Sequence, residues 1–297
     1  MVVVHNGKHL AAESRRLVYS IIVVMITMFV EIIGGIISHS LALLSDAVHM
    51  LADLCALILS WAAHRFSTKK SDMQRSYGYH RLQIIAAFVN GLTLFLIAIV
   101  IIIESIKRLI FPVNIEWKIM LIIASIGLIT NIIVYFILHK CESNLNIKSA
   151  VFHIIGDILG SLSAILASIA IMLTEWQIVD PILSVFISAI ILNSGYKILK
   201  NSCHILLEGT PDSISVEEIK REIRSDLPEV IDVHHIHAWS LSDNYFIITM
   251  HAKIKQTVQY TDILYRIKKI LLNKFEIVHS TVEIEYDECV DDKILKH

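Results

Sequence analysis

The sequence lacks the cysteine patterns of disulfide-rich domains and of thiolate zinc sites. Its four cysteines, at positions 55, 141, 203 and 289, lie far apart and form no C-x-x-C pair. This spacing argues against a disulfide framework and against a four-thiolate metal site. The net charge of −2 also lacks the basic excess of a nucleic-acid-binding protein.

Proline is scarce, with only four residues, and all four lie at expected element boundaries: Pro112, Pro181, Pro211 and Pro228. A proline inside a helix removes a backbone N–H and costs about 3 kcal/mol or more. The long helices of this chain are therefore expected to be continuous.

The chain also lacks a recognisable cleavable signal and the H-E-x-x-H motif of intramembrane metalloproteases. The first 16 residues are polar after a short apolar start, and the first long apolar run would insert by itself. We therefore expect a protein that is not an enzyme.

What the chain has instead is apolar sequence, with 55% hydrophobic residues and a mean hydropathy of +0.64. An apolar helix of roughly 20 residues spans a bilayer. Six segments approach or exceed this length: Leu17–Ile37, Leu41–Ala63, Leu82–Ile103, Trp117–Leu138, Ala150–Leu173 and Ile178–Leu199. The sequence thus predicts an all-α membrane domain of six helices.

Lysine and arginine are distributed unequally between the two sides of these segments. On one side they precede the first segment, occupy the links after the second and fourth segments and follow the sixth. On the other side, residues 38–40 and 174–178 contain none, and the link after the third segment has only Lys107, Arg108 and Lys118 nearby. The positive-inside rule then places both termini in the cytoplasm. Short loops without a targeting extension favour a bacterial inner (plasma) membrane.

From about Glu208 the composition becomes that of a small water-soluble domain. A capping box at Ser215–Glu218 opens a helix, and alternating segments at 230–240, 245–253 and 279–286 predict strands around a second helix at 258–275. This order predicts a cytosolic α+β domain of the type α-β-β-α-β. We expect a tail at 1–16, the membrane domain at 17–207, the cytosolic metal-binding domain at 208–290 and a tail at 291–297.

Two apolar segments carry the same His-x-x-x-Asp pattern, at His49–Asp53 and at His153–Asp157. Residues four apart lie on one face of a helix, and ionisable groups at membrane depth cost about 2.5–3.5 kcal/mol each on insertion scales. Two imidazoles and two carboxylates suit tetrahedral zinc better than magnesium or calcium. The alternative is that each pair is a structural polar contact between helices.

Asp46 precedes His49 by three residues and is a candidate for the ion path. Glu31, Asn90 and Asn131 are further polar residues expected within the apolar segments. Hydrogen bonding between helices is an equal alternative for each of them.

The soluble domain has its own cluster of potential ligands. His237, His251 and His279 on three strands, together with Glu285, would supply nitrogen and oxygen donors for a second metal. Alternation places His235, a further candidate, on the face of His237 and places His234 on the other face. Solvated or core histidines are the alternative.

The chain resembles the cation diffusion facilitator family, in its zinc-transporting branch of bacterial exporters and vesicular transporters. The residues that carry the resemblance are SLALLSDAVHMLAD (40–53), YGYHRLQIIAAFVNG (77–91), NLNIKSAVFHIIGDILGS (144–161), LLEGTP (206–211) and HHIHAWSL (234–241). The resemblance implies a homodimer that exchanges a divalent metal for protons. It implies that the two His-x-x-x-Asp pairs form the transport site and that the cytosolic domain dimerises.

The resemblance also points to secondary residues. His80, and His5 or His9, match histidines that bind metal in vesicular relatives, and Arg81 and Glu208 match a charge pair at the dimer. Arg75 and Tyr79 stand where some bacterial exporters place another zinc site. A histidine at position 49 is typical of zinc rather than manganese transporters.

The expected function is therefore export of Zn²⁺ from the cytoplasm in exchange for protons, with Cd²⁺ as a second candidate substrate. Four protein ligands leave no open position for a catalytic water, which suits carriage. A membrane zinc sensor without transport is the alternative, although it leaves the membrane His–Asp pairs unexplained.

Overall fold

The structure is a computed structural model that describes residues 22–67, 72–139, 145–242, 245–256, 259–287, 289 and 291. Within the helices, the side chains of residues 53, 56, 57, 59–67, 138, 139 and 145–154 lie outside the described part. The chain divides into two compact units, one of Met1–Trp61 with Val89–Leu199 and the other of Ala62–Phe88 with Lys200–His297.

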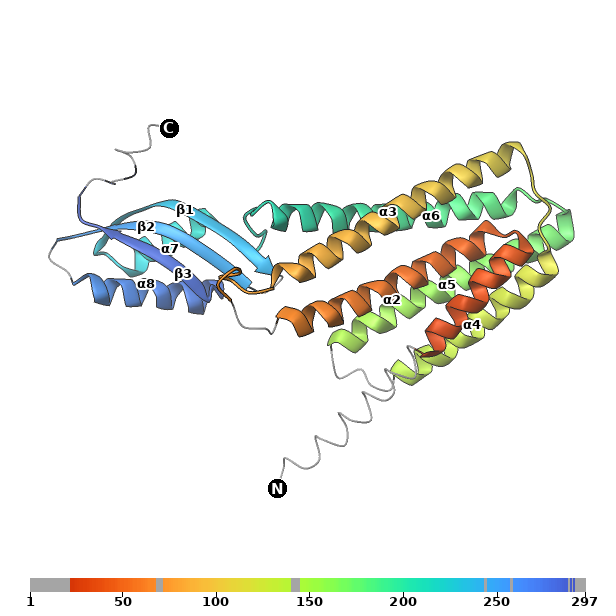
Figure 1. The fold of residues 1–297 in the computed structure, drawn as a ribbon, viewed down its shortest axis with the longest axis horizontal. Helices are drawn as coiled ribbons and strands as arrows, with labels where there is room; N and C mark the ends of the chain where they lie inside the picture. The colour runs from red at the N-terminus through yellow and green to blue at the C-terminus, as the bar shows by residue number, and fades with distance from the viewer. Residues whose placement is uncertain are drawn as a thin grey trace, which may run out of the picture. The chain divides into compact units, whose positions relative to one another are not determined.

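The described parts of all six predicted membrane segments are helical (Figure 1). They are the helix Ile22–Ser38, α2 (Leu41–Ser67), α3 (Arg81–Ile110), α4 (Trp117–His139), α5 (Leu145–Thr174) and α6 (Val179–Leu206). By length and composition, α3 to α6 each contain a stretch able to cross a membrane, and Ile22–Ser38 and Leu41–Ala52 are shorter apolar helices. The all-α membrane domain is confirmed.

The helices of the first unit pack closely where side chains are small. On α3 and α6, a Cβ on Gly91 would lie 2.8 Å from Ile198 and one on Gly195 would lie 3.1 Å from the backbone of Phe95. Small residues at helix contacts are typical of membrane proteins, because apolar burial alone does not drive association there. A second contact region joins α2, α4 and α5 through Leu43, Ala124 and Ala164.

The second unit contains a three-stranded sheet in the order β1-β2-β3, made of β1 (Val230–Ser242), β2 (Tyr245–Ile254) and β3 (His279–Glu285). β1 pairs antiparallel with β2, and β2 pairs parallel with β3. The helices α7 (Val216–Asp226) and α8 (Tyr260–Phe275) lie along the sheet (Figure 1). The predicted α-β-β-α-β order is confirmed.

The core of this domain follows from the helix and strand periodicities. α7 buries Ile219 and Ile223, and α8 buries Ile263, Ile267 and Leu271, each at spacings of four residues. These side chains pack in one apolar cluster with alternate residues of β2, from Ile248 to Ile254, and with Val230, Val233 and Ala238 of β1. The predicted helix start at Ser215 is also confirmed, because Ser215 Oγ accepts a hydrogen bond from the backbone N–H of Glu218 at 3.2 Å and caps α7.

The register of β1 against β2 shifts between His234 and His237. His235, in this irregular segment, has a backbone φ of 48°, a left-handed conformation that is uncommon for residues other than glycine. An extra residue in one strand interrupts the alternation of side chains between the two faces. This bulge lies in the middle of the histidine cluster.

Candidate functional site

The predicted transport residues lie in the interiors of α2 and α5. Asp46 and Asp157 are buried, with 4% and 3% of their surface exposed, and His49 is partly buried. Asp53 and His153 fall within the two helices, but their side chains lie outside the described residues. The described members therefore occupy the buried, polar positions that the sequence predicts.

Helices α2 and α5 meet directly near these residues. A Cβ on Gly160 would lie 2.8 Å from Asp46 Oδ1, so the absence of a side chain lets the carboxylate approach α5. Asp157 precedes Gly160 by three residues and thus lies one turn away on α5. This contact brings together the two helices that carry the His-x-x-x-Asp pairs.

A third carboxylate, that of Glu31 on the helix Ile22–Ser38, belongs to the same buried polar region as the two aspartates. Glu31 is 1% exposed and lies within electrostatic range of both Asp46 and Asp157. Nearby, Asn131 Nδ2 on α4 donates a hydrogen bond to Ser161 Oγ on α5 at 3.3 Å. The polar interior therefore includes residues from four helices.

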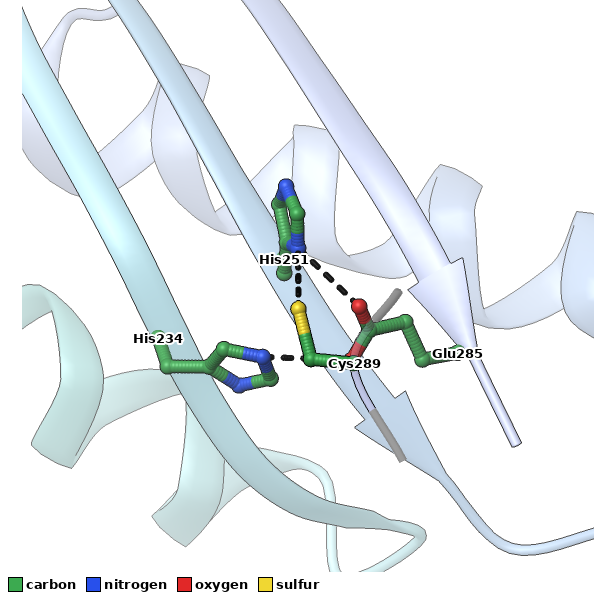
Figure 2. Close-up of side chains that lie close together, drawn as sticks. All are labelled: His234, His251, Glu285 and Cys289. Atoms are coloured by element: carbon green, nitrogen blue, oxygen red, sulfur yellow. Dashed lines mark hydrogen bonds and ion pairs between the residues drawn. The ribbon is translucent and has the colours of Figure 1, made fainter. Parts of the chain in front are cut away.

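The second unit contains a compact group of potential metal ligands, shown in Figure 2. Ligand atoms of His234, His251, Glu285 and Cys289 all lie within 4.8 Å of one another. His251 Nδ1 is 3.0 Å from Glu285 Oε1 and 3.4 Å from Cys289 Sγ, and His234 Nε2 is 3.1 Å from Glu285 Oε2. Two nitrogens, a carboxylate and a thiol form a donor set that suits zinc.

Electrostatic interactions favour the ionised form of Glu285, which supplies the carboxylate of this group. Burial raises the pKa of its side chain, but hydrogen bonds with Cys289 and His251 and the nearby charges of His234 and His251 outweigh burial, so the pKa lies below its ordinary value. A metal ligand must be deprotonated to bind. Glu285 is therefore ready to accept a cation near neutral pH.

This group of potential metal ligands contains only part of the cytosolic ligand set that the sequence predicts. His251 and Glu285 lie together, whereas His237 faces Thr249 across the strands and His279 contacts the Tyr77 ring edge-on at 5.6 Å. Neither histidine belongs to the two potential metal-ligand groups found among the described residues.

The bulge at His235 explains why simple alternation misplaces these side chains. The rings of His234 and His235 both lie near His251, at 5.5 and 5.0 Å between centroids. The prediction that His234 and His235 lie on opposite faces of the strand is therefore wrong at the bulge. The pairing of His234 with His251 across the strands is the signal that would have added His234 to the potential ligands.

Sequence reasoning also missed Cys289 as a potential ligand, because it has no C-x-x-C partner. It lies four residues after Glu285, beyond the end of β3, and is buried. A second potential group combines His235, His251 and Asp291. His251 is common to both groups and is thus their central residue.

The remaining candidates have other surroundings. His80 stacks on Tyr245, with 5.0 Å between ring centroids. Arg81 Nη2 forms an ion pair with Glu208 Oε1 at 2.8 Å, on partly exposed side chains. His5 and His9 lie outside the described residues.

Comparison with known proteins also divides the chain into two regions. Residues 17–207 match the family described as the cation efflux transmembrane domain, and residues 211–287 match the cation efflux protein, cytoplasmic domain.

Similar sequences extend along almost the whole chain. It is 40% identical to the zinc transporter ZitB of Pectobacterium atrosepticum over 99% of this chain and 92% of that protein. It is 39% identical to the cadmium, cobalt and zinc/H⁺–K⁺ antiporter of Bacillus velezensis over 95% of this chain and 91% of that protein. A solved structure, the metal-bound C-terminal domain of the CzcD transporter, is 27% identical, covers 24% of this chain and 99% of that domain, and has a TM-score of 0.23.

The two domain matches and the nearly full-length relatives give one conclusion. The chain is an integral membrane protein that belongs to the cation efflux family, the cation diffusion facilitators.

Proposed function

We propose that this chain is a secondary transporter that exports Zn²⁺ from the cytoplasm across the bacterial inner membrane in exchange for protons. The observation that carries the proposal is the 40% identity, over 99% of the chain, to a protein named a zinc transporter. The name of the Bacillus velezensis relative includes cadmium and protons, which supports Cd²⁺ as a second substrate and proton coupling.

His49, Asp53, His153 and Asp157 bind the transported ion. The burial of Asp157 and the contact between α2 and α5 at Gly160 support this assignment. A metal-binding histidine must be neutral and a metal-binding aspartate must be ionised. Zinc that enters from the cytoplasm therefore displaces protons, and protons that arrive from the outside displace zinc.

The cytosolic group His234, His251, Glu285 and Cys289 is a resident zinc site. His234 and Cys289 replace His237 and His279 in this proposal, because only the former lie beside His251 and Glu285. A metal bound there would hold the C-terminal segment against β1 and β2 of the same domain.

The protein acts as a homodimer with both termini in the cytoplasm. The name of the family that matches residues 211–287, a cytoplasmic domain, supports this orientation together with the distribution of lysine and arginine. The Arg81–Glu208 ion pair contributes at the dimer, and a tail at 1–16, domains at 17–207 and 208–290 and a tail at 291–297 complete the organisation.

The test is zinc flux into proteoliposomes with an imposed pH gradient. Wild-type protein should accumulate zinc only with the gradient, and Asp157→Ala should abolish accumulation. His49→Asp should widen the metal range to include manganese. Zinc binding without any flux in the wild type would instead favour a membrane sensor.

A further inference from the structure

The most exceptional polar group of the membrane unit is Glu31. It is 1% exposed, and within the described part of the chain neither carboxylate oxygen has a hydrogen-bond partner. A buried carboxyl group without such a partner is costly, and its charge must be neutralised by a proton or a bound cation. The transport site proposed above does not use this residue.

The helices around Glu31 leave space for its carboxylate. On α4, the position against Glu31 Oε1 is Gly127, and any side chain there would occupy the space of the carboxylate. The same Gly127 position is 3.3 Å from Ser161 Oγ on α5. Glu31 therefore points into a cradle formed by α4 and α5.

A second carboxylate has an equivalent cradle. Asp46 lies against Gly160 of α5, and Glu31 is within electrostatic range of Asp46 as well as of Asp157. Two carboxylates within electrostatic range of each other in a buried interior repel unless one of them takes up a proton or a cation lies between them. Carboxylate and hydroxyl oxygens are ligands that divalent cations accept.

The position of the two residues along their helices indicates a place on the transport path. Glu31 lies seven residues before Ser38, and Asp46 lies five residues after Leu41, so both are near the connection between these helices. Asp46 is also seven residues before Asp53, or about 10 Å along α2. That connection is the side assigned to the outside of the membrane.

We infer that Glu31 and Asp46 form a second divalent-cation position, which receives Zn²⁺ beside Asp157 on its way from the transport site to the outside. This inference rests on the proposed function for its direction, although binding itself does not require transport. In this scheme Asp157 lies between the transport site and the second position. The ion passes from a site with nitrogen and oxygen ligands to a site with oxygen ligands alone.

The experiment isolates this position from the others. The full-length chain in lipid nanodiscs carries His49→Ala, Asp53→Ala and His251→Ala, which remove the transport site and both cytosolic groups. Equilibrium zinc titration should still show one Zn²⁺ bound per chain. Adding Glu31→Gln should remove it, and circular dichroism checks that helical content is unchanged.

Three further variants extend the test: one fills the cradle without changing a charge, and two are controls. Gly127→Ala keeps Glu31 but fills its cradle, and it should also remove the bound zinc. Glu104→Gln changes another carboxylate of the membrane unit, one that pairs with Arg108 on α3, and it should retain the zinc. Gly156→Ala, where a Cβ would have no atom of the described residues within 4 Å, is the control for a helical glycine.

Each result decides between the explanations. No bound zinc in the triple variant would overturn the inference, and a loss of transport in Glu31→Gln alone would then mean that Glu31 carries only a proton. Zinc that is bound in the triple variant but unaffected by Glu31→Gln and Gly127→Ala would overturn it too. A wild-type protein that moves no zinc, with the Glu31-dependent ion still bound, would contradict the proposed function and leave this inference intact.

Discussion

Asp180, in the first turn of α6, holds the start of α2 through Ser40, whose hydroxyl donates a hydrogen bond to Asp180 Oδ1 at 2.5 Å. The two carboxylate oxygens also accept hydrogen bonds from the backbone N–H groups of Leu41 and Ala42, at 2.9 and 3.2 Å. Asp180 is fully buried. A residue 140 positions away thus caps the helix that carries Asp46, His49 and Asp53.

The first prediction concerns this cap. Asp180→Asn should lower the stability of the membrane unit by about 1–3 kcal/mol, because a charge-assisted acceptor is replaced by a group that also carries N–H donors. Zinc flux should fall with it, since the start of α2 is no longer held. Thermal unfolding in detergent and proteoliposome flux measure the two effects.

The control for this change is Asp212→Asn, which alters an exposed aspartate of the second unit. It should leave the melting temperature and flux unchanged. Equal melting temperatures for Asp180→Asn and wild type would show that the cap does not stabilise α2.

The second prediction concerns the contact between α2 and α5. Gly160→Ala would place a Cβ 2.8 Å from Asp46 Oδ1, and we expect overpacking to cost about 1–3 kcal/mol and to reduce zinc flux strongly. Gly156→Ala, four residues earlier on the same helix, would place a Cβ away from every described side chain and should be neutral or slightly stabilising. Similar flux in the two variants would argue against a close approach at Gly160.

The third prediction concerns the thiol of the cytosolic group. Cys289→Ser should weaken zinc binding by the second unit by roughly tenfold or more, because a hydroxyl replaces a soft thiolate ligand. Cys203→Ser, on α6 and outside the group, is the matched control, and His237→Ala should also bind zinc as the wild type does. Competition titration with a zinc chelator in a transport-site-deficient background measures the affinity. If His237→Ala weakened zinc binding more than Cys289→Ser did, the result would instead support the ligand set that strand alternation predicts.

The fourth prediction is a pH dependence in metal-free protein. The pKa of Glu285 in the folded state lies below its ordinary value of 4.5, so its ionised form adds stability that is present above this value and is lost as pH falls through the folded-state pKa. Glu285→Gln should therefore unfold at lower urea concentration than wild type at pH 7.

The difference between the two proteins should begin to narrow as the pH falls below the ordinary value of 4.5, and it should be lost once the pH has passed the lower pKa of Glu285 in the folded state. Urea titrations with a chelator at pH 7 and at acidic pH provide the measurement. A gap that widens on acidification would contradict the assigned direction of the pKa.

Local sequence was sufficient for the elements of this protein and for their order. The capping box at Ser215, the fourfold spacing of Ile219 and Ile223 and the apolar length of the membrane helices are all encoded within a few turns of chain. The His-x-x-x-Asp pairs predicted buried ionisable positions, and the buried Asp157 agrees with that. Such features need no partner from elsewhere in the chain to be recognised.

The tertiary structure decided which side chains meet. The left-handed residue His235 interrupts the alternation of β1, so that His234 joins His251, and the return of the chain after β3 brings Cys289 to the same place. Asp180 reaches α2, and Glu31 fits against Gly127, only because helices distant in sequence pack together. Periodicity describes the faces of one element, whereas a bulge, a helix cap from another helix and a glycine cradle depend on two elements at once.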